Sequence, residues 1–158
     1  MGLKSISRLT LSLLLCLSVG IVEGLVTRPE IATWYAGLVK PSWTPAPPVF
    51  PIAWTVLYIL MAISFWRLWN LETRSAARTA AMTWFWIQLA FNALWSPVFF
   101  GWHGTRAALV IIVALFVAIA ATIVTASRVD RPAAWLLAPY LLWVAYATTL
   151  NTGVVAMN

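Results

Sequence analysis

The sequence has very few residues of the kinds that carry most enzyme chemistry. Its 158 residues include one cysteine, one histidine and four acidic residues. The single cysteine, Cys16, excludes an intramolecular disulfide framework and a thiolate metal cluster. No nucleophile elbow, phosphate-binding glycine loop or paired-histidine metal motif occurs in the chain. The sequence therefore predicts no metal site and no required cofactor, and it contains no conventional catalytic constellation.

Charge is scarce as well. Charged residues make up 9% of the chain and hydrophobic residues 63%, and the mean hydropathy is +0.89. A soluble domain carries about a quarter charged residues, so this composition predicts a multi-pass integral membrane protein in contact with lipid. The net charge of +6 does not indicate nucleic-acid binding, because the basic residues are scattered at the ends of apolar runs and form no patch.

Five apolar segments predict an all-α fold, a five-transmembrane-helix bundle in a single domain over residues 1–158. The expected spans are 9–26, 50–69, 77–100, 107–126 and 133–156, with a proline-rich loop over 28–48. The first segment has the layout of a secretory signal, but its apolar character resumes past Gly20, which favours a retained span. Pro97 and Pro139 lie inside spans and predict kinks.

The distribution of basic residues predicts the orientation of the bundle. An odd number of spans places the N-terminus, the 70s loop and the turn near 130 on one side. That side holds seven of the ten basic residues: Lys4, Arg8, Arg67, Arg74, Arg78, Arg128 and Arg131. The other side holds Arg28, Lys40 and Arg106. Because cytoplasmic loops are enriched in Lys and Arg, we expect a cytoplasmic N-terminus and an exoplasmic C-terminus.

Helical spacing places aromatic stripes on three spans. The stripes are Trp54, Tyr58, Met61 and Phe65; then Trp84, Gln88, Asn92, Trp95 and Phe99; then Leu136, Tyr140, Trp143, Ala147 and Leu150, with Asn151 beside them. Interfacial aromatic belts and helix-to-helix amide bonds explain such stripes without a ligand, whereas an internal ligand cavity explains them equally well. Glu23, near the end of a span, is interpreted as a watered carboxylate, and His103 as a solvated interfacial residue.

Several motifs carry a family resemblance. They are Trp34-Tyr35-x-x-Leu38-x-Lys40-Pro41-x-Trp43-x-Pro45, Phe50-Pro51-x-x-Trp54-Thr55-x-Leu57-Tyr58, Phe91-Asn92-x-x-Trp95-x-x-x-Phe99-Phe100, and Pro139-Tyr140-x-x-Trp143-x-x-Tyr146-Ala147-x-x-Leu150-Asn151. In this order, over nearly the whole chain, they resemble the tryptophan-rich sensory protein/translocator protein family (TspO/MBR, the peripheral-type benzodiazepine receptor family), in its bacterial form.

This resemblance implies a five-helix bundle, a homodimer, and a pocket under the first loop. Family members bind porphyrins and synthetic isoquinoline or benzodiazepine-type ligands. At the matching positions, the ligand-binding residues would be Tyr35, Pro45, Trp54, Asn92, Trp95, Trp143 and Ala147. The sterol motif of animal members needs a tyrosine and a basic residue after Asn151, and the chain has neither there, so sterol binding is not expected.

Three functions follow from the resemblance. The first is binding of a tetrapyrrole, protoporphyrin IX or haem, by a sensor, regulator or transporter. The second is light-dependent degradation of bound protoporphyrin IX, in which Trp54 and Trp143 would be the catalytic residues. The third is a scaffold whose ligand gates its contacts with partner proteins.

Overall fold

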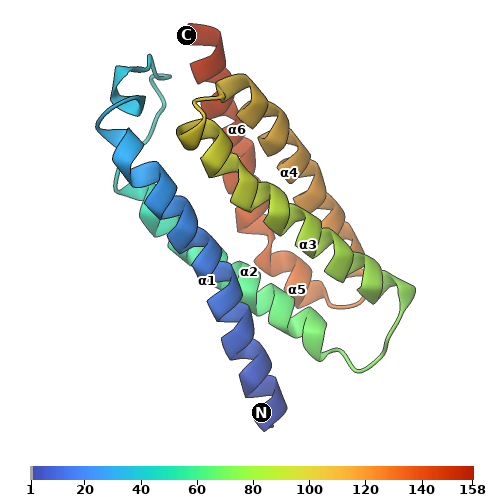
Figure 1. The fold of residues 1–158 in the computed structure, drawn as a ribbon. Coiled ribbons are helices and arrows are strands. Elements are labelled where there is room, and N and C mark those ends of the chain that lie inside the picture. The colour runs from blue at the N-terminus through green and yellow to red at the C-terminus, as the bar shows by residue number, and fades with distance from the viewer. Residues whose placement is uncertain (1) are drawn as a thin grey trace.

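The computed structural model describes residues 2–158, and within them every regular element is a helix. The elements in order are α1 Leu3–Ile31, η1 Tyr35–Gly37, α2 Val49–Asn70, α3 Ala76–Ser96, η2 Pro97–Gly101, α4 Thr105–Ser127, α5 Arg131–Leu136 and α6 Ala138–Met157. The N-terminal end of α1 and the C-terminal end of α6 lie at opposite ends of the bundle (Figure 1). The all-α class predicted from composition and periodicity is therefore confirmed for the described residues.

The helices pack as two pairs joined by the last segment of the chain. The most extensive contacts join α3 to α4 and α1 to α2, and both α5 and α6 pack against α4. The α5 helix also contacts α2, so that the last segment connects the two pairs (Figure 1).

Four helical segments are long and apolar enough to cross a membrane. They are α1, α2, α4 and the combined segment Arg131–Met157. The α3 helix is not among them, because Arg78, Gln88 and Asn92 lower its hydropathy together with its tryptophans.

The helices extend beyond several of the predicted spans, and three of the differences from the sequence prediction involve a proline. The α1 helix runs to Ile31 with Pro29 inside it, so the loop begins later than residue 28. After Ser96 the third segment changes to the π-helix η2, in which the Trp102 amide donates to the Pro97 carbonyl at 3.0 Å. The last segment divides at Leu137 into α5 and α6, just before Pro139, which lacks an amide hydrogen.

The buried core lies between α1, α2, α3, α4 and α6. Cys16, Tyr58, Met61, Phe85 and Tyr140 belong to one cluster of buried side chains. A second cluster, around Phe99 and Phe100, lies below the first loop.

One glycine is required where α1 crosses α2. A Cβ atom on Gly20 would lie 2.6 Å from a ring carbon of Tyr58, closer than packed carbon atoms approach. The absence of a side chain at this position therefore lets the tyrosine ring lie directly against the α1 backbone.

Candidate functional site

A chain of polar side chains crosses the interior of the bundle, with Tyr58 at its centre. The Tyr58 hydroxyl lies 2.6 Å from Oε2 of Glu23 and 2.6 Å from Oδ1 of Asn92. The Asn92 amide nitrogen donates to the Tyr140 hydroxyl at 2.8 Å. These four residues come from α1, α2, α3 and α6, so the chain connects four helices.

The hydrogen count along this chain limits its arrangement. Tyr58 has one hydroxyl hydrogen, yet it faces two oxygen atoms at the same short distance. Both contacts are satisfied when Glu23 is protonated and donates to Tyr58, or when the Asn92 amide is turned so that its nitrogen faces Tyr58. In either arrangement the side chains of Glu23, Tyr58, Asn92 and Tyr140 have hydrogen-bond partners within the protein, which lipid could not supply.

Aromatic rings surround this polar chain. Trp54 stacks on Tyr58 with ring centroids 5.6 Å apart and meets Tyr140 edge-on at 6.2 Å. On α6, Trp143 meets Phe50 edge-on at 6.0 Å. The indole nitrogen of Trp143 is buried and has no hydrogen-bond acceptor among the described residues. We call Trp54, Trp143 and Phe50 the aromatic wall. It contains one buried hydrogen-bond donor, the Trp143 indole N–H, that has no acceptor among the described residues.

Trp95 has a different environment from the other two tryptophans. Its indole N–H donates to Oδ1 of Asn151 at 3.2 Å, and its ring stacks on Phe99 at 4.9 Å. Asn151 in turn donates to the Thr105 carbonyl at 3.0 Å. Trp95 thus connects α3 to α6 and to the start of α4.

The beginning of the first loop packs on the second core cluster. Tyr35 meets Phe100 at 5.5 Å and Phe99 at 6.3 Å, and burial raises the pKa of its hydroxyl above the usual value. The Lys40 ammonium lies 4.7 Å from the centre of the Tyr35 ring and donates to the Tyr35 and Leu38 carbonyls at 2.7 and 2.9 Å. Lys40 therefore holds the turn closed.

The rest of the loop is fastened to the C-terminal half of α6. Pro41 is buried against Gly153, where a Cβ atom would overlap the proline ring. Hydrogen bonds add to this contact: Trp43 Nε1 to Thr149 Oγ1 at 3.3 Å, the Tyr146 hydroxyl to the Trp43 carbonyl at 2.6 Å, and two between the Asn158 side chain and the Val39 backbone, each at 3.0 Å. The loop thus covers this end of α6 and depends on it for position.

The structure brings most of the predicted site residues together. Trp54, Trp95, Trp143 and Ala147 pack against the same core cluster, and Asn92 is bonded to two of its members. Tyr35 belongs to the second cluster, which Trp95 joins to the first. Pro45 is half-buried in the loop, outside both clusters.

Two residues have partners that the sequence prediction missed. The sequence predicts a watered carboxylate at Glu23, whereas in the structure Glu23 bonds to Tyr58 inside the bundle. Its spacing of three residues from Gly20 places both on the α1 face toward α2, and this spacing is a signal for the contact. His103 is exposed, as predicted, and in addition it stacks on Trp34 at 4.2 Å and lies 3.1 Å from Oε2 of Glu30.

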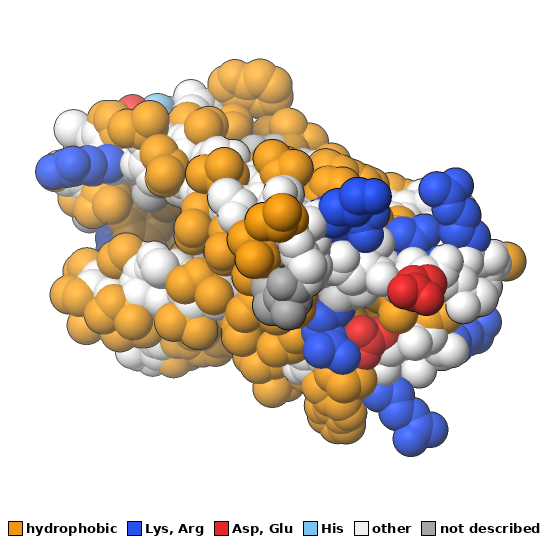
Figure 2. Space-filling view, turned by 90° about the horizontal axis from the view of Figure 1, so that it is seen from below, with side chains coloured by type: hydrophobic (Ala, Val, Ile, Leu, Met, Phe, Trp, Pro, Cys, Tyr) orange, Lys and Arg blue, Asp and Glu red, His pale blue; other side chains and the backbone are white. Residues whose placement is uncertain are grey.

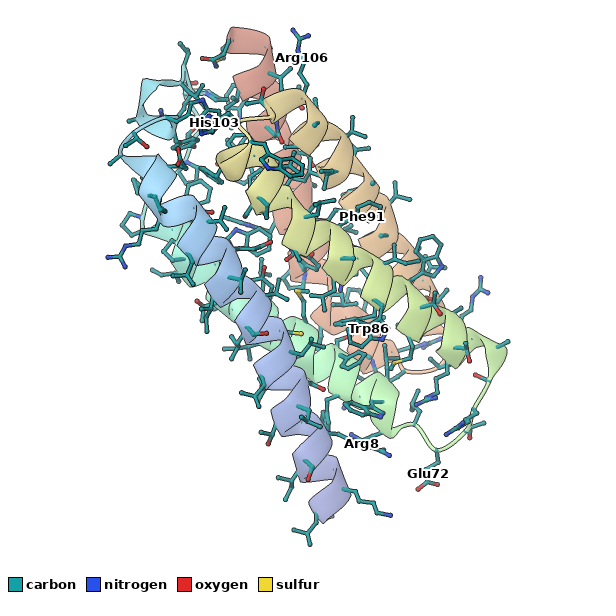
Figure 3. All side chains as sticks on the ribbon, in the orientation of Figure 1. Arg8, Glu72, Trp86, Phe91, His103 and Arg106 are labelled. Carbon is teal, nitrogen blue, oxygen red and sulfur yellow. The ribbon has the colours of Figure 1, made fainter. Side chains whose placement is uncertain are left out.

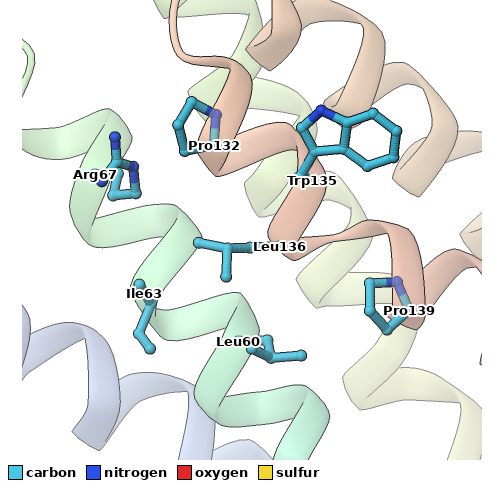
Figure 4. A pocket seen from close by; sticks show the side chains of 7 residues that line it. All are labelled: Leu60, Ile63, Arg67, Pro132, Trp135, Leu136 and Pro139. Carbon is cyan, nitrogen blue, oxygen red and sulfur yellow. The ribbon is translucent and has the colours of Figure 1, made fainter.

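Two cavities lie away from these residues. A groove of about 480 Å³ opens between α2 and the α5–α6 segment (Figure 4). It is lined by Leu60, Ile63, Arg67, Pro132, Trp135, Leu136 and Pro139. A second cavity, of about 370 Å³, lies at the turn between α2 and α3. No predicted ligand-binding residue lines either cavity.

The comparison with known proteins covers almost the whole chain. A model described as the TspO/MBR family matches residues 12–157. The Tryptophan-rich protein TspO of Chlorobaculum tepidum is 39% identical over 156 residues, which are 98% of this chain and 98% of that protein. The Tryptophan-rich sensory protein of Cereibacter sphaeroides is 38% identical over 135 residues, 85% of this chain and 82% of that protein. The human Translocator protein is 40% identical over 119 residues, 75% of this chain and 70% of that protein. These matches and the apolar helices confirm the resemblance inferred from the motifs: the chain is an integral membrane protein that belongs to the TspO/MBR family.

Proposed function

We propose that this protein binds a tetrapyrrole, protoporphyrin IX or haem, as a membrane sensor or carrier. The ligand would lie among Trp54, Asn92, Trp95, Trp143 and Ala147, under the loop that contains Tyr35 and Pro45. The names of two relatives, a sensory protein and a translocator, favour a sensor or a carrier over an enzyme.

The observation that carries the proposal is the unused indole N–H of Trp143. A buried donor without an acceptor costs about 1–3 kcal/mol, so few are retained in a folded protein. The Trp143 ring meets Phe50 edge-on at 6.0 Å and packs against the core cluster that contains Tyr140. A flat aromatic ligand with carboxylate groups would stack on the rings and accept this hydrogen.

Entry of such a ligand requires the loop to move. Asn92 already bonds to Tyr58 and Tyr140, and Pro41 is packed against Gly153. If a ligand displaced the loop, the protein would lose the contacts between the loop and α6. The ligand would then stack on the aromatic rings below the loop. The proline content of the loop limits the entropy that the loop loses when it closes again.

A titration with protoporphyrin IX tests the proposal. Binding to the detergent-solubilised protein is followed by quenching of tryptophan fluorescence, in the dark. Trp143→Phe keeps an aromatic ring, smaller than the indole, and removes the N–H donor, so we expect affinity to fall about tenfold, the equivalent of about 1.4 kcal/mol. The double variant Trp54→Ala/Trp143→Ala removes both indole rings and should abolish measurable binding.

Trp135→Phe is the matched control, because Trp135 is 75% exposed and lines the groove between α2 and α5. It should bind like the unaltered protein. The assignment is refuted if the double alanine variant binds normally. A loss of affinity in Trp135→Phe alone would place the ligand in the groove instead.

A second function, light-dependent degradation of bound protoporphyrin IX, has one specific observation in its favour. Trp54 stacks on Tyr58, and the Tyr58 hydroxyl lies 2.6 Å from a carboxylate oxygen. In the arrangement in which Glu23 is ionised, an indole oxidised by the excited porphyrin could recover its electron from Tyr58, whose phenolic proton would pass to Glu23, while the reduced porphyrin would pass its extra electron to dioxygen. Illumination of the complex in the presence of dioxygen tests this: bleaching in Tyr58→Phe should be slower than in the unaltered protein. Bleaching no faster than that of free porphyrin in detergent excludes the activity.

We further propose that all five helical segments cross the membrane, with the N-terminus in the cytoplasm. Most basic side chains gather at one end of the bundle, seen from below in Figure 2. Single cysteines placed in the α2–α3 turn and in the first loop, in a Cys16→Ser background, test this topology. Only the loop cysteine should react with an impermeant maleimide added to intact cells.

A further inference from the structure

The cavity at the turn between α2 and α3 is polar and basic. It has a volume of about 370 Å³, and its lining includes Arg8 from α1, Trp69 and Asn70 from the end of α2, Glu72 and Arg74 from the turn, and Arg78 from α3. Arg8 and Glu72 lie at one end of the bundle, and His103 and Arg106 lie at the other (Figure 3). The cavity is therefore far from the first loop and independent of the proposed tetrapyrrole site.

The positive charge of this cavity is not neutralised within the described residues. Three guanidinium groups and one carboxylate line it, which leaves a net charge of +2 (3 − 1). The ion pairs of the structure are Arg67 with Asp130 and His103 with Glu30. Among residues 2–158, the three arginines of the cavity thus have no carboxylate within 4.0 Å. Their charge is available to an anion.

Two of the three arginines are held in place before any ligand binds. Arg8 donates to Oδ1 of Asn70 at 3.1 Å and lies over the Trp69 ring, 5.7 Å from its centre. Arg78 donates to the Leu68 and Trp69 carbonyls at 3.0 and 3.1 Å. Each guanidinium has five N–H groups, so both retain free donors. Side chains that are already ordered lose little entropy when they bind a ligand.

The same contacts offset the partial negative charge at the C-terminal end of α2. The last carbonyl groups of a helix carry partial negative charge, which would repel an anion at the end of α2. Arg8 and Arg78 already bond to groups at that end. The third arginine, Arg74, is exposed in the turn and makes no hydrogen bond with the described residues, so it is free to close over a ligand.

We propose that this cavity binds a phosphate group. Guanidinium forks match the oxygen atoms of a phosphate, and three of them converge here without a competing carboxylate contact. The end of α2 carries Trp66 and Trp69, residues typical of the level of the lipid headgroups. The phosphate therefore comes either from an anionic phospholipid of the adjacent leaflet or from free phosphate in the aqueous phase.

Native mass spectrometry of the detergent-solubilised protein tests the lipid source. The probes are phosphatidylglycerol and phosphatidylcholine with identical acyl chains. Arg74→Gln removes one charge without breaking any hydrogen bond of the fold, so we expect its affinity for phosphatidylglycerol to fall about fivefold. Arg74→Lys keeps the charge but loses the fork, and should fall by less. Arg128→Gln is the control, because Arg128 is exposed on the next turn at the same end of the bundle.

Inorganic phosphate alone, titrated by calorimetry, tests the other source. Selective binding of phosphatidylglycerol that weakens in Arg74→Gln and not in Arg128→Gln supports the site and assigns it to a lipid. Binding of inorganic phosphate that depends on Arg74, with no lipid preference, supports the site and assigns it to a free anion. Equal losses in Arg74→Gln and Arg128→Gln, or no binding of either probe, overturn the proposal.

Discussion

Tyr58 offers the sharpest test of how the bundle is held together, because its hydroxyl contacts two helices at once. Replacing it by phenylalanine keeps the ring that packs under Gly20 and stacks on Trp54. The substitution removes the contacts with Glu23 and Asn92, each at 2.6 Å. It therefore isolates the hydrogen bonds from the packing.

The free-energy cost of losing a buried hydrogen bond differs between water-soluble proteins and membrane proteins. In a water-soluble core, each buried group that loses its partner costs about 1–3 kcal/mol. In membrane proteins the measured values average about 0.6 kcal/mol and reach about 1.7, because the unfolded chain in lipid or detergent also finds partners. Asn92 keeps its bond to Tyr140, which favours the smaller value. For two bonds we expect Tyr58→Phe to lower the free energy of unfolding by about 1–3 kcal/mol.

The assay is reversible unfolding in mixed micelles with increasing sodium dodecyl sulfate, followed by far-ultraviolet circular dichroism. Tyr146→Phe is the matched control, because it removes one exposed hydroxyl bond, to the Trp43 carbonyl. A double-mutant cycle with Asn92→Leu measures the pair directly, and we expect a coupling of about 1 kcal/mol. Zero coupling, together with equal losses in Tyr58→Phe and Tyr146→Phe, would refute the view that this polar chain stabilises the bundle.

Glu23→Gln tests whether Glu23 is protonated in its contact with Tyr58. A neutral amide can donate to Tyr58 as a protonated carboxyl group does, so we expect a change of less than about 0.5 kcal/mol. Because the amide oxygen of glutamine can also accept the Tyr58 hydrogen, a loss as large as that of Tyr58→Phe would show that the contact depends on the charge of an ionised Glu23.

The remaining predictions concern two glycines at close contacts. Gly20→Ala should lower the free energy of unfolding by about 1–3 kcal/mol, because its Cβ atom would lie 2.6 Å from the Tyr58 ring. Gly24→Ala, which meets nothing within 4 Å, should be neutral or stabilising by up to about 1 kcal/mol in the same assay. Gly153→Ala should displace Pro41 and loosen the first loop, seen as faster cleavage of the loop by an added protease. Cleavage at an unchanged rate would mean that Pro41 does not hold the loop on α6.

The positions of the aromatic stripes follow from the sequence because helical periodicity is local. Spacing alone places Trp54 and Tyr58 on one face of α2, and Tyr140 and Trp143 on one face of α6. In the structure, Trp54, Trp143 and the two tyrosines belong to one cluster. Periodicity identifies which residues of a helix face inward, but it carries no information about which atoms then meet.

Contacts between distant segments required the structure. The spacing of Gly20 and Glu23 places both on one face of α1, but it does not identify Tyr58, 35 residues away, as the partner of Glu23. Nothing in the sequence joins Val39 to Asn158. The proline effects were only partly predictable as well. Pro97 and Pro139 mark interruptions of the expected spans, whereas Pro29 is accommodated inside α1. A proline removes a fixed local bond, but the neighbouring helices decide whether the chain bends there.

The sequence by itself determined the membrane class, the all-α fold, the family and the inward helix faces of this protein. These properties depend on composition and on periodic spacing, which any stretch of chain displays before it folds. Only the tertiary structure decided that Glu23 is bonded within the bundle, that the first loop is fastened to α6, and that Arg8, Arg74 and Arg78 line one cavity. Each of these is a distance between segments that are far apart in the chain, and the packing of the helices against one another sets that distance.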